Sequence, residues 1–410
     1  MANGTDRTRV LFITHSMTLG GAPTSLNLLL ESLDPERYEC VVACIYPSPE
    51  VEEFHASTGA EVVAAHEIVD FPHTTGGWLR LWNPRHVIHL VRALVRYKSS
   101  VRATGSLIDQ VRPDIVHVNS LILVAAAEGT HRAGVPLVWH VRESIVRGHV
   151  GLRRRWLANK VRTLPDAAVF LSEDDMRNMG VPRKNWRVVP NWTSFDPPFV
   201  DRGEARHRLA VSPDGLLVLL LGGFSRLKGA DVLLRAWPAV KAAVPDARCV
   251  IAGVVRPSAR PMAKVARLLL PVVGIRSDFQ ECERLLAGAD GVVARPFRTG
   301  IGDLFAAADA LAFPAKEPHF PRPVVESFAH RVPAVASDIG PMRDIMEAGS
   351  LGILVAAGSP QALADGLIRA LTRTEEMEAM TDQAFREGKR RFSPAVGIAS
   401  IEEIYREVRR

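Results

Sequence analysis

The chain has 410 residues, 47% of them hydrophobic and 23% charged, so it is long enough for two or three domains and too apolar to be disordered. The net charge of +6 is unevenly spread: residues 1–79 hold 3 Lys/Arg against 11 Asp/Glu, whereas residues 80–162 hold 15 against 4. A basic region of this kind favours anionic partners such as nucleotides or phospholipids.

The sequence predicts neither an export signal nor a membrane-spanning segment. A polar start runs directly into a short apolar strand, without the cationic start, long apolar stretch and cleavage site typical of a signal peptide. No apolar run approaches the roughly 18 residues of a spanning helix. The four cysteines form no C-x-x-C pair, which favours buried, reduced thiols. We therefore expect a cytoplasmic protein.

Short β-branched runs alternate with helical stretches along the whole chain. In the first half, strands are predicted at residues 10–14, 40–45, 115–118, 137–140 and 167–171, with a helix at 22–33. In the second half, strands are predicted at residues 216–221, 248–252, 291–294, 310–313, 334–336 and 352–355, with a helix at 229–243. This alternation predicts an α/β protein with two parallel, doubly wound sheets.

A segment rich in Pro, Asp and Ser, residues 190–215, is predicted to link the two halves. We expect a first domain at 1–195, a second at 196–390, and an amphipathic helix at 394–408 near the end of the chain. In open parallel sheets, ligands bind beyond the carboxyl ends of the strands. Two such sheets that face each other would place both sets of loops on one cleft.

Two strand-to-helix turns are candidates for binding an anion. Gly20 and Gly21 lie between the first strand and a helix, where small residues let a ligand approach the backbone and the helix N-terminus favours a phosphate. The alternative is a tight turn without a ligand. The second turn lies between the strand predicted at 216–221 and the helix predicted at 229–243, and it carries Gly222, Gly223, Ser225, Arg226 and Lys228. Its cations and the free amides of the helix start could together bind a diphosphate without a metal.

A third segment, residues 312–340, joins a strand to a helix that begins near Pro323. Its loop carries Glu317 and His319, and Glu326 lies in the first helical turn, where it either contacts a ligand or only complements the helix dipole. Because proline has no N–H, the amide donors offered at this helix start are expected to come from the other residues, Arg322, Val324 and Val325.

These segments, in this order, resemble the retaining GT-B glycosyltransferases of family 4, also called the glycosyl transferases group 1. The resemblance covers nearly the whole chain. It rests on GGAPTSLNLLLESL, DIVHVNS, LVWHVRES, PDAAVFLSED and VVPNW in the first half, and on the Lys-Gly motif, IAG, FRTGIGDLFAAADALAFP and the Glu-bearing segment in the second. The resemblance implies two Rossmann-like domains facing a central cleft, with the C-terminal helix of 391–410 packing back on the first domain.

The resemblance also implies roles for individual residues. Lys228 would bind the phosphates of the donor, Glu326 the ribose hydroxyls, and the backbone around Arg295 the base. His140 matches a histidine that lies near the transferred sugar in many relatives. The implied catalytic residues are His140, Lys228 and Glu317, and the implied donor site comprises Gly20, Gly21, Gly223, Ser225, Arg226, Lys228, Arg295, Arg322, Pro323, Val324 and Glu326.

Two departures from the family pattern concern the donor site. Gly223 stands where the family usually has an arginine, so Arg226 is the alternative cation for the phosphates. Glu317 and Glu326 are separated by eight residues instead of the family's seven, with Pro318 at the expected place. His15 and Asn119 are further candidates at strand ends of the first domain.

The activity that the resemblance implies is transfer of a sugar, with retention, from a nucleoside-diphosphate-sugar to an acceptor hydroxyl. UDP or GDP is the expected nucleotide, and the acceptor would be a glycan, a lipid-linked sugar or a small molecule in cell-surface glycan or glycolipid synthesis. The chain has no Asp-x-Asp motif. We therefore expect neither a metal nor another cofactor, with Lys228 and helix amides stabilising the departing diphosphate.

The basic region has two interpretations. Residues 77–102 interleave apolar and cationic side chains, and a second cationic cluster follows at 147–162. This face either rests on an anionic membrane that presents a lipid-linked acceptor, or packs its apolar stripe into the core beneath a solvated rim.

Other classes of protein remain open at this point. A nucleoside-diphosphate-sugar 2-epimerase would share the fold, and a donor-binding subunit without activity would share the site. A nucleic-acid binder fits the charge but lacks aromatic platforms or a recognition-helix motif. No nucleic-acid partner is therefore expected.

Overall fold

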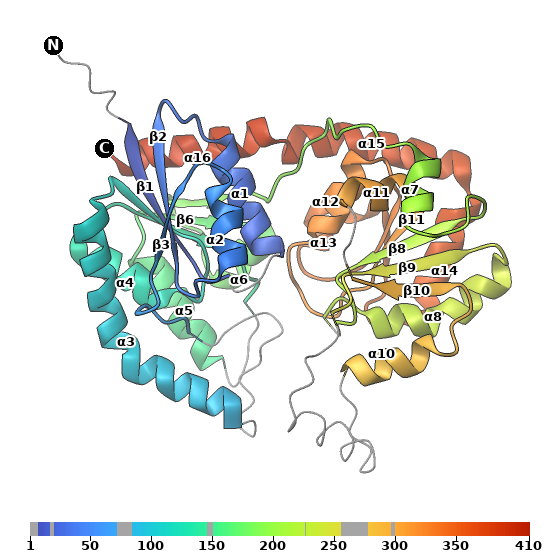
Figure 1. Ribbon diagram of the computed structural model, residues 1–410, viewed down its shortest axis with the longest axis horizontal. Coiled ribbons are helices and arrows are strands. Elements are labelled where there is room, and N and C mark those ends of the chain that lie inside the picture. The colour runs from blue at the N-terminus through green and yellow to red at the C-terminus, as the bar shows by residue number, and fades with distance from the viewer. Residues whose placement is uncertain are drawn as a thin grey trace. The chain divides into compact units, whose positions relative to one another are not determined.

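The computed structural model describes residues 7–16, 20–71, 84–145, 151–225, 227–255, 278–296 and 300–410. The chain divides into two compact units, Met1–Thr193 with Phe392–Arg410 (unit 1) and Ser194–Arg391 (unit 2). The sequence had suggested divisions at 195 and 390. Each unit contains one parallel sheet covered by helices (Figure 1).

The sheet of unit 1 has seven strands in the described residues, in the order β3-β2-β1-β4-β5-β6-β7. Every neighbouring pair is parallel, and β1 lies between β2 and β4 as in a doubly wound sheet. The strands are β1 (Thr8–Thr14), β2 (Tyr38–Cys44), β3 (Glu61–Ala64), β4 (Ile115–Val118), β5 (Leu137–Val141), β6 (Ala167–Phe170) and β7 (Trp186–Val188).

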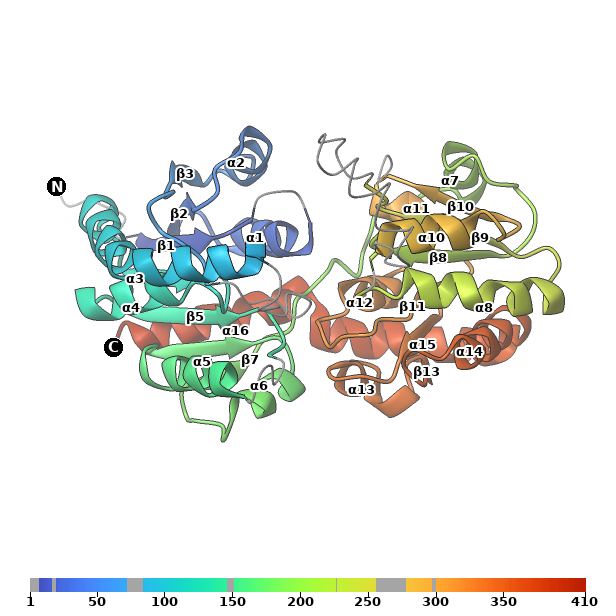
Figure 2. The same cartoon turned by 90° about the horizontal axis from the view of Figure 1, so that it is seen from below.

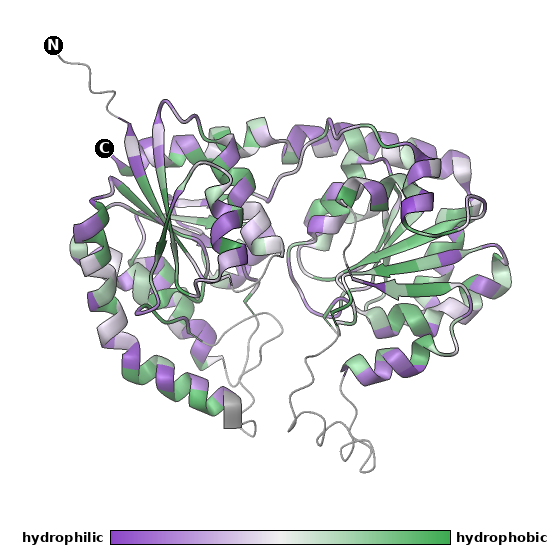
Figure 3. Cartoon of the chain, in the orientation of Figure 1, coloured by the Kyte–Doolittle hydropathy of each residue, from purple (hydrophilic) through white to green (hydrophobic). Residues whose placement is uncertain are grey.

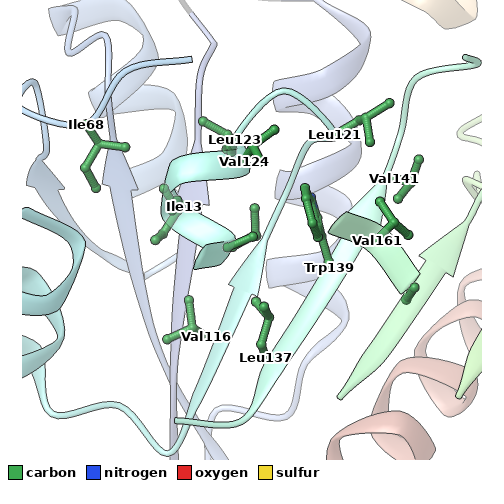
Figure 4. Packing of buried hydrophobic residues seen from close by; sticks show 14 of the residues in the cluster. Ile13, Ile68, Val116, Leu121, Leu123, Val124, Leu137, Trp139, Val141 and Val161 are labelled. Carbon is green, nitrogen blue, oxygen red and sulfur yellow. The ribbon is translucent and has the colours of Figure 1, made fainter. Parts of the chain in front are cut away.

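Successive residues of β1 supply two cores because they point to opposite faces of the sheet. Leu11 and Ile13 pack in the core beneath α3, α4 and α5, part of which is drawn in Figure 4. Val10 and Phe12 pack on the other face against α1, α2 and α16. The helices are α1 (Gly21–Ser32), α2 (Pro49–Ala56), α3 (Pro84–Val111), α4 (Val124–Ala133), α5 (Leu152–Thr163), α6 (Glu173–Met179) and α16 (Pro394–Val408).

The sheet of unit 2 has six strands in the described residues, in the order β10-β9-β8-β11-β12-β13. The helices α8, α10 and α14 share one core with it, and α11 and α12 lie on its opposite side (Figures 1 and 2). Its strands are β8 (Leu217–Leu221), β9 (Arg248–Ala252), β10 (Val292–Arg295), β11 (Ala310–Phe313), β12 (Ala334–Ser337) and β13 (Ile353–Val355).

Further helices complete unit 2 and connect it to the end of unit 1. They are α7 (Arg202–Arg208), α8 (Ala230–Ala243), α10 (Asp278–Leu286), α11 (Ile301–Ala307), α12 (Arg322–Ala329), α13 (Met342–Ile345), the 3₁₀ turn Glu347–Gly349, α14 (Pro360–Thr372) and α15 (Thr374–Phe392). No helix among the described residues combines the length and apolarity needed to cross a membrane.

The expected α/β class with two parallel sheets is confirmed, and the central strands lie within one or two residues of their predicted bounds. Two edge strands, β3 and β7, were not predicted. Both are short, and β3 is only half-buried, so neither has the apolar run that marks a central strand of a parallel sheet. Cys44, Cys249 and Cys282 are buried free thiols as expected, whereas Cys40 is half-buried.

The helix α16 is fixed on unit 1 by tight packing. A Cβ at Gly397 would overlap the ring of Trp192, so only glycine lets the helix approach this closely. Ile401, Ile404 and Tyr405 are then buried in the core that includes β1 and β5. The last helix of the chain is therefore an integral part of unit 1.

The start of α8 depends on glycine for two reasons. Gly229 has a φ of +72°, and a Cβ there would overlap the carbonyl oxygen of Pro314, just beyond β11. The close approach brings the loop after β8 against the loop after β11. Two turns that carry candidate site residues are joined at this contact.

We predict that Gly229→Ala destabilises unit 2 by about 3 kcal/mol, from the left-handed backbone and the overlap together. Gly358→Ala is the matched control, since Gly358 has a φ of +73° but a Cβ there would meet no atom within 4 Å. It should cost only about 1 kcal/mol. Urea unfolding of the two variants measures the difference, and equal losses would contradict the role given to the Pro314 contact.

Candidate functional site

The glycines after β8 make room for Lys228. The N–H groups of Gly222 and Gly223 both donate to the carbonyl of Ala252, at 3.0 and 2.9 Å, which folds the loop back over β9. A Cβ at Gly222 would lie 2.8 Å from Cγ of Lys228. The lysine stem therefore lies directly against the glycine backbone, and burial lowers the pKa of Lys228 to about 8.

The ammonium of Lys228 lies 2.8 Å from Nε2 of His319 and 5.5 Å from the ring centre of Phe313. The Nδ1–H of His319 donates to the carbonyl of Glu317 at 2.8 Å, so Nε2 of the neutral ring carries the lone pair that accepts from the lysine. Burial and the neighbouring lysine lower the pKa of His319 to about 3. The pair therefore holds one positive charge, on Lys228, at neutral pH.

Two ion pairs lie on the same segments of unit 2. Nζ of Lys316 contacts the carboxylate of Asp231 in the first turn of α8. Nε of Arg322 donates to Oε1 of Glu326 at 2.8 Å. Glu326 is only 7% exposed, and burial raises its pKa while Arg322 opposes that shift. The carboxylate of Glu326 is thus held from within its own helix.

The expectation that the start of α12 offers backbone amides to a ligand is wrong. The N–H of Arg322 donates to the carbonyl of Phe320 at 3.1 Å, and those of Val324 and Val325 donate to the carbonyl of Pro321 at 2.9 and 3.3 Å. The reason is that the helix begins at Arg322, one residue earlier than predicted, so its N-cap carbonyl is already in place. Pro323 has no N–H to offer.

The remaining predicted donor residues are placed as follows. Arg295 ends β10, its guanidinium donates to the carbonyl of Leu209, and its own carbonyl accepts from Val254 at 2.9 Å. The carbonyl of Ser225 accepts from the N–H of Lys228 at 3.1 Å. Glu317 is half-buried beside His319. Arg226 lies outside the described residues.

The N-terminus of α1 carries the two glycines of the first predicted turn. The helix begins at Gly21 without a side-chain cap, and a Cβ at Gly20 or Gly21 would meet no atom within 4 Å. The first turn is closed by the N–H of Thr24, which donates to the carbonyl of Gly20 at 3.1 Å. Within the described chain, no acceptor is seen for the amides of Gly21 and Ala22.

Polar atoms gather at the carboxyl ends of β1, β4 and β5 in unit 1. Arg142 donates to the side-chain oxygens of Asn119 and Asn191, at 2.6 and 2.7 Å. Several buried atoms at these strand ends have no hydrogen-bond partner in the described chain: Thr14 Oγ1, His15 Nδ1, Ser16 Oγ, Asn119 Nδ2 and His140 Nε2. Leaving a buried polar group unpaired costs about 1–3 kcal/mol, so a concentration of them marks a place that a polar ligand would complete.

The structure therefore brings the predicted residues together in groups. Lys228 and Glu317 meet through His319, whereas Glu326 is paired with Arg322. His15, Asn119 and His140 share one end of the unit 1 sheet. Sequence reasoning gave no role to His319, although it stands in the predicted loop, and it missed the side chains that hold the strand ends in place, His117, Arg142 and Tyr405.

Two family models match almost the whole chain. Residues 201–387 match the glycosyl transferases group 1, and residues 20–192 match the glycosyl transferase 4-like domain. The chain belongs to the group 1 glycosyltransferases, which confirms the resemblance seen in the sequence.

Individual relatives support the same assignment. The D-inositol 3-phosphate glycosyltransferase of Actinosynnema mirum is 32% identical over 188 residues, 45% of this chain and 42% of that one, so the chain matches less than half of that relative. The enzyme of that name from Streptosporangium roseum is 26% identical over 81% of this chain and 78% of its own. The structure of Anabaena HepE with UDP and glucose superposes with a TM-score of 0.73 at 18% identity, covering 98% of this chain and 100% of its own. The fold is GT-B.

We predict that the ammonium of Lys228 titrates near pH 8, well below an ordinary lysine, because burial disfavours its charged form. NMR of ¹³C-methylated lysines should show one resonance that shifts in this range, and Lys228→Arg should remove it. Lys241, half-buried on the following helix α8, serves as the control. A Lys228 resonance that titrates with the others would contradict the buried setting.

Proposed function

We propose that the protein transfers a sugar from a nucleoside-diphosphate-sugar to an acceptor hydroxyl, with retention of configuration and without a metal. Its membership of the group 1 glycosyltransferases supports sugar transfer. The main support for a donor-phosphate site is the ammonium of Lys228, which is buried at a glycine turn between β8 and α8. UDP is the first nucleotide to test, since the similar HepE structures contain UDP or UDP-glucose.

The chemistry asks the protein to stabilise a leaving diphosphate. As the bond between the sugar and the diphosphate breaks, negative charge grows on the phosphate oxygens, and a cation in a partly desolvated site stabilises it strongly. Lys228 is proposed to supply that cation. The acceptor oxygen forms the new bond on the face that the diphosphate leaves, and the diphosphate takes the proton of the acceptor.

The other donor contacts are proposals of the same kind. Glu326 would bind the ribose hydroxyls, held in position by Arg322 at 2.8 Å. Glu317 would reach the transferred sugar from the loop that also carries His319. The backbone around Arg295 would meet the base, and Arg226 would be a second cation for the phosphates.

The test is a thermal-shift panel of UDP-, GDP-, ADP- and CDP-sugars, since a ligand that binds the folded state raises the melting temperature by mass action. One nucleotide should stabilise the wild-type protein. Lys228→Ala should weaken its affinity by about 10- to 100-fold, because a charge-assisted contact is lost. Lys241→Ala should leave the affinity unchanged. A donor that binds both variants equally would remove Lys228 from the site.

The same preparation tests the need for a metal. With the donor identified, turnover is measured before and after treatment with EDTA. We expect no loss, since cations and amides of the protein take the place of a metal in the proposed mechanism. Activity that disappears with chelator and returns with manganese would overturn this part of the proposal.

The family and relatives are transferases, which does not favour an epimerase. An epimerase would convert the donor alone into its 2-epimer, and a donor-binding subunit would bind without turnover. Product analysis with and without a panel of acceptor sugars separates these activities.

We further propose that the exposed part of α3 rests on an anionic membrane. Ile88, Val91, Leu94 and Val95 are 52–76% exposed, so this stripe is not core packing. The exposed cations of the same helix are Arg92, Lys98 and Arg102. Figure 3 shows the alternation of apolar and polar residues along α3. Residues 77–83 and Arg147, part of the predicted surface, lie outside the described residues. Apolar side chains between cations fit the interface of an anionic bilayer, which would present a lipid-linked acceptor.

Flotation with phosphatidylglycerol-containing vesicles at moderate salt tests the membrane surface. We expect the wild-type protein to float and the double variant Ile88→Glu/Val95→Glu to lose most of its binding, because each glutamate places charge where an apolar side chain would enter the bilayer. Val181→Glu changes another exposed apolar residue of unit 1 and should have no effect. Wild-type protein that stays with the unbound fraction would exclude the proposal.

A further inference from the structure

A chain of three buried side chains leads from the last helix of the protein to the strand ends of unit 1. The hydroxyl of Tyr405 on α16 lies 2.7 Å from Nδ1 of His117 on β4, and Nε2 of His117 lies 3.2 Å from Nδ1 of His140 on β5. All three side chains are at most 1% exposed. The proposed transferase activity explains only His140 among them, and nothing in it requires the other two.

The direction of these hydrogen bonds follows from counting protons. Burial lowers the pKa of His117 to about 3 and that of His140 well below its usual range, so both rings are neutral and each has one donor and one acceptor nitrogen. The only acceptor within reach of the Tyr405 O–H in the described chain is Nδ1 of His117. His117 then carries its proton on Nε2 and donates it to Nδ1 of His140.

His140 must therefore carry its own proton on Nε2. That N–H is buried, and it has no partner in the part of the chain that the structure describes. The opposite arrangement would leave the buried hydroxyl proton of Tyr405 without an acceptor and would make Nε2 of His140 a lone pair. Either arrangement leaves one buried donor without a partner in the described chain, but in the first it is the Nε2–H of His140 at a strand end, where a bound ligand would accept from it, whereas in the second it is the Tyr405 hydroxyl, packed in the core between α16 and the sheet. Because a donor that stays unpaired in the core is costly, this difference favours the first arrangement.

The surroundings of His140 indicate which ligand atom its N–H would meet. Phe12 pairs with His117 and His117 with Val138, so residues two further along, Thr14, Asn119 and His140, lie on that same face of the sheet. Asn119 offers an unpaired Nδ2, since its oxygen already accepts from Arg142. Amide and imidazole donors beside a threonine hydroxyl suit a ligand that presents several oxygens, as a carbohydrate does.

We propose that Tyr405 and His117 are positioning residues that fix His140 as a hydrogen-bond donor, through Nε2–H, to a hydroxyl oxygen of a carbohydrate substrate. This rests on the proposed function for the nature of the ligand, but the hydrogen-bond chain stands without it. Since the proton is on Nε2, that nitrogen has no lone pair for the proton of an acceptor. His140 therefore orients substrate and does not act as a general base.

The first measurement needs no substrate. In protein labelled with ¹⁵N-histidine, NMR distinguishes protonated from unprotonated ring nitrogens, and His117→Gln and His140→Gln assign the signals. We expect Nε2–H on His140 in the wild type. In Tyr405→Phe the fixed tautomer should be lost from both rings. Tyr38→Phe is the matched control, because Tyr38 contacts the ring of Tyr405 at 5.9 Å but is not part of the chain.

The second measurement asks which sugar His140 contacts. Once the panel has identified the donor, its affinity and that of the bare nucleoside diphosphate are compared in wild type, Tyr405→Phe and His140→Met. If the transferred sugar is the partner, affinity for the nucleotide-sugar falls about tenfold and that for the nucleotide is unchanged. If the acceptor is the partner, the affinities for the nucleotide-sugar and for the nucleoside diphosphate are unchanged, and the KM for the acceptor rises about tenfold. His140→Gln, which retains an N–H donor, should recover part of either loss.

Three results would overturn the proposal. If His140 of the wild type is protonated on Nδ1, the hydrogen bonds run in the opposite direction. If the tautomers are unchanged in Tyr405→Phe, Tyr405 does not fix them. Unchanged donor affinity and acceptor KM in His140→Met remove the carbohydrate contact. If no nucleotide-sugar binds the wild-type protein, the proposed function and the ligand half of this inference fail together, while the tautomer measurement still decides the hydrogen-bond chain.

Discussion

The proposed donor site of unit 2 depends on keeping one ammonium group partly desolvated. Lys228 is placed there because Gly222 leaves room for its stem and Gly229 lets the loop after β8 meet the loop after β11. The neutral ring of His319 then accepts from the ammonium without cancelling its charge. A carboxylate at the same place would neutralise the lysine. The positive charge of Lys228 is therefore not neutralised by its partner, and the low polarity around it strengthens the electrostatic interactions of that charge.

Two carboxylates near this site are paired with cations other than Lys228. Glu326 is held by Arg322 and Asp231 by Lys316, so Lys228 does not share its charge with either. Gly223 stands where the family usually has an arginine, but Lys228 still provides a positive charge at this turn. One buried cation provides more stabilisation than an exposed one, because solvent screens it less.

In unit 1, buried polar side chains lie at the carboxyl ends of the central strands. Its sheet supplies Thr14, Asn119 and His140 on one face, and α16 closes that face from the far end of the sequence. Tyr405 reaches His117 only because Gly397 lets α16 pack against Trp192. The end of the chain thus contributes to the site through a hydrogen-bond chain, although it supplies no atom at the strand ends themselves.

The sequence by itself determined the α/β class, the central strands, the family, and the positions of Lys228 and His140, because glycine turns, β-branched runs and ordered motifs are local signals. Only the tertiary structure decided how these residues are held. It showed that the amides of Val324 and Val325 are used within α12, and that His319 and Tyr405 are the partners of the predicted residues. Lys228 and His319 are separated by 91 positions in the sequence, and His117 and Tyr405 by 288. Such pairings depend on packing between distant elements, which no local pattern records.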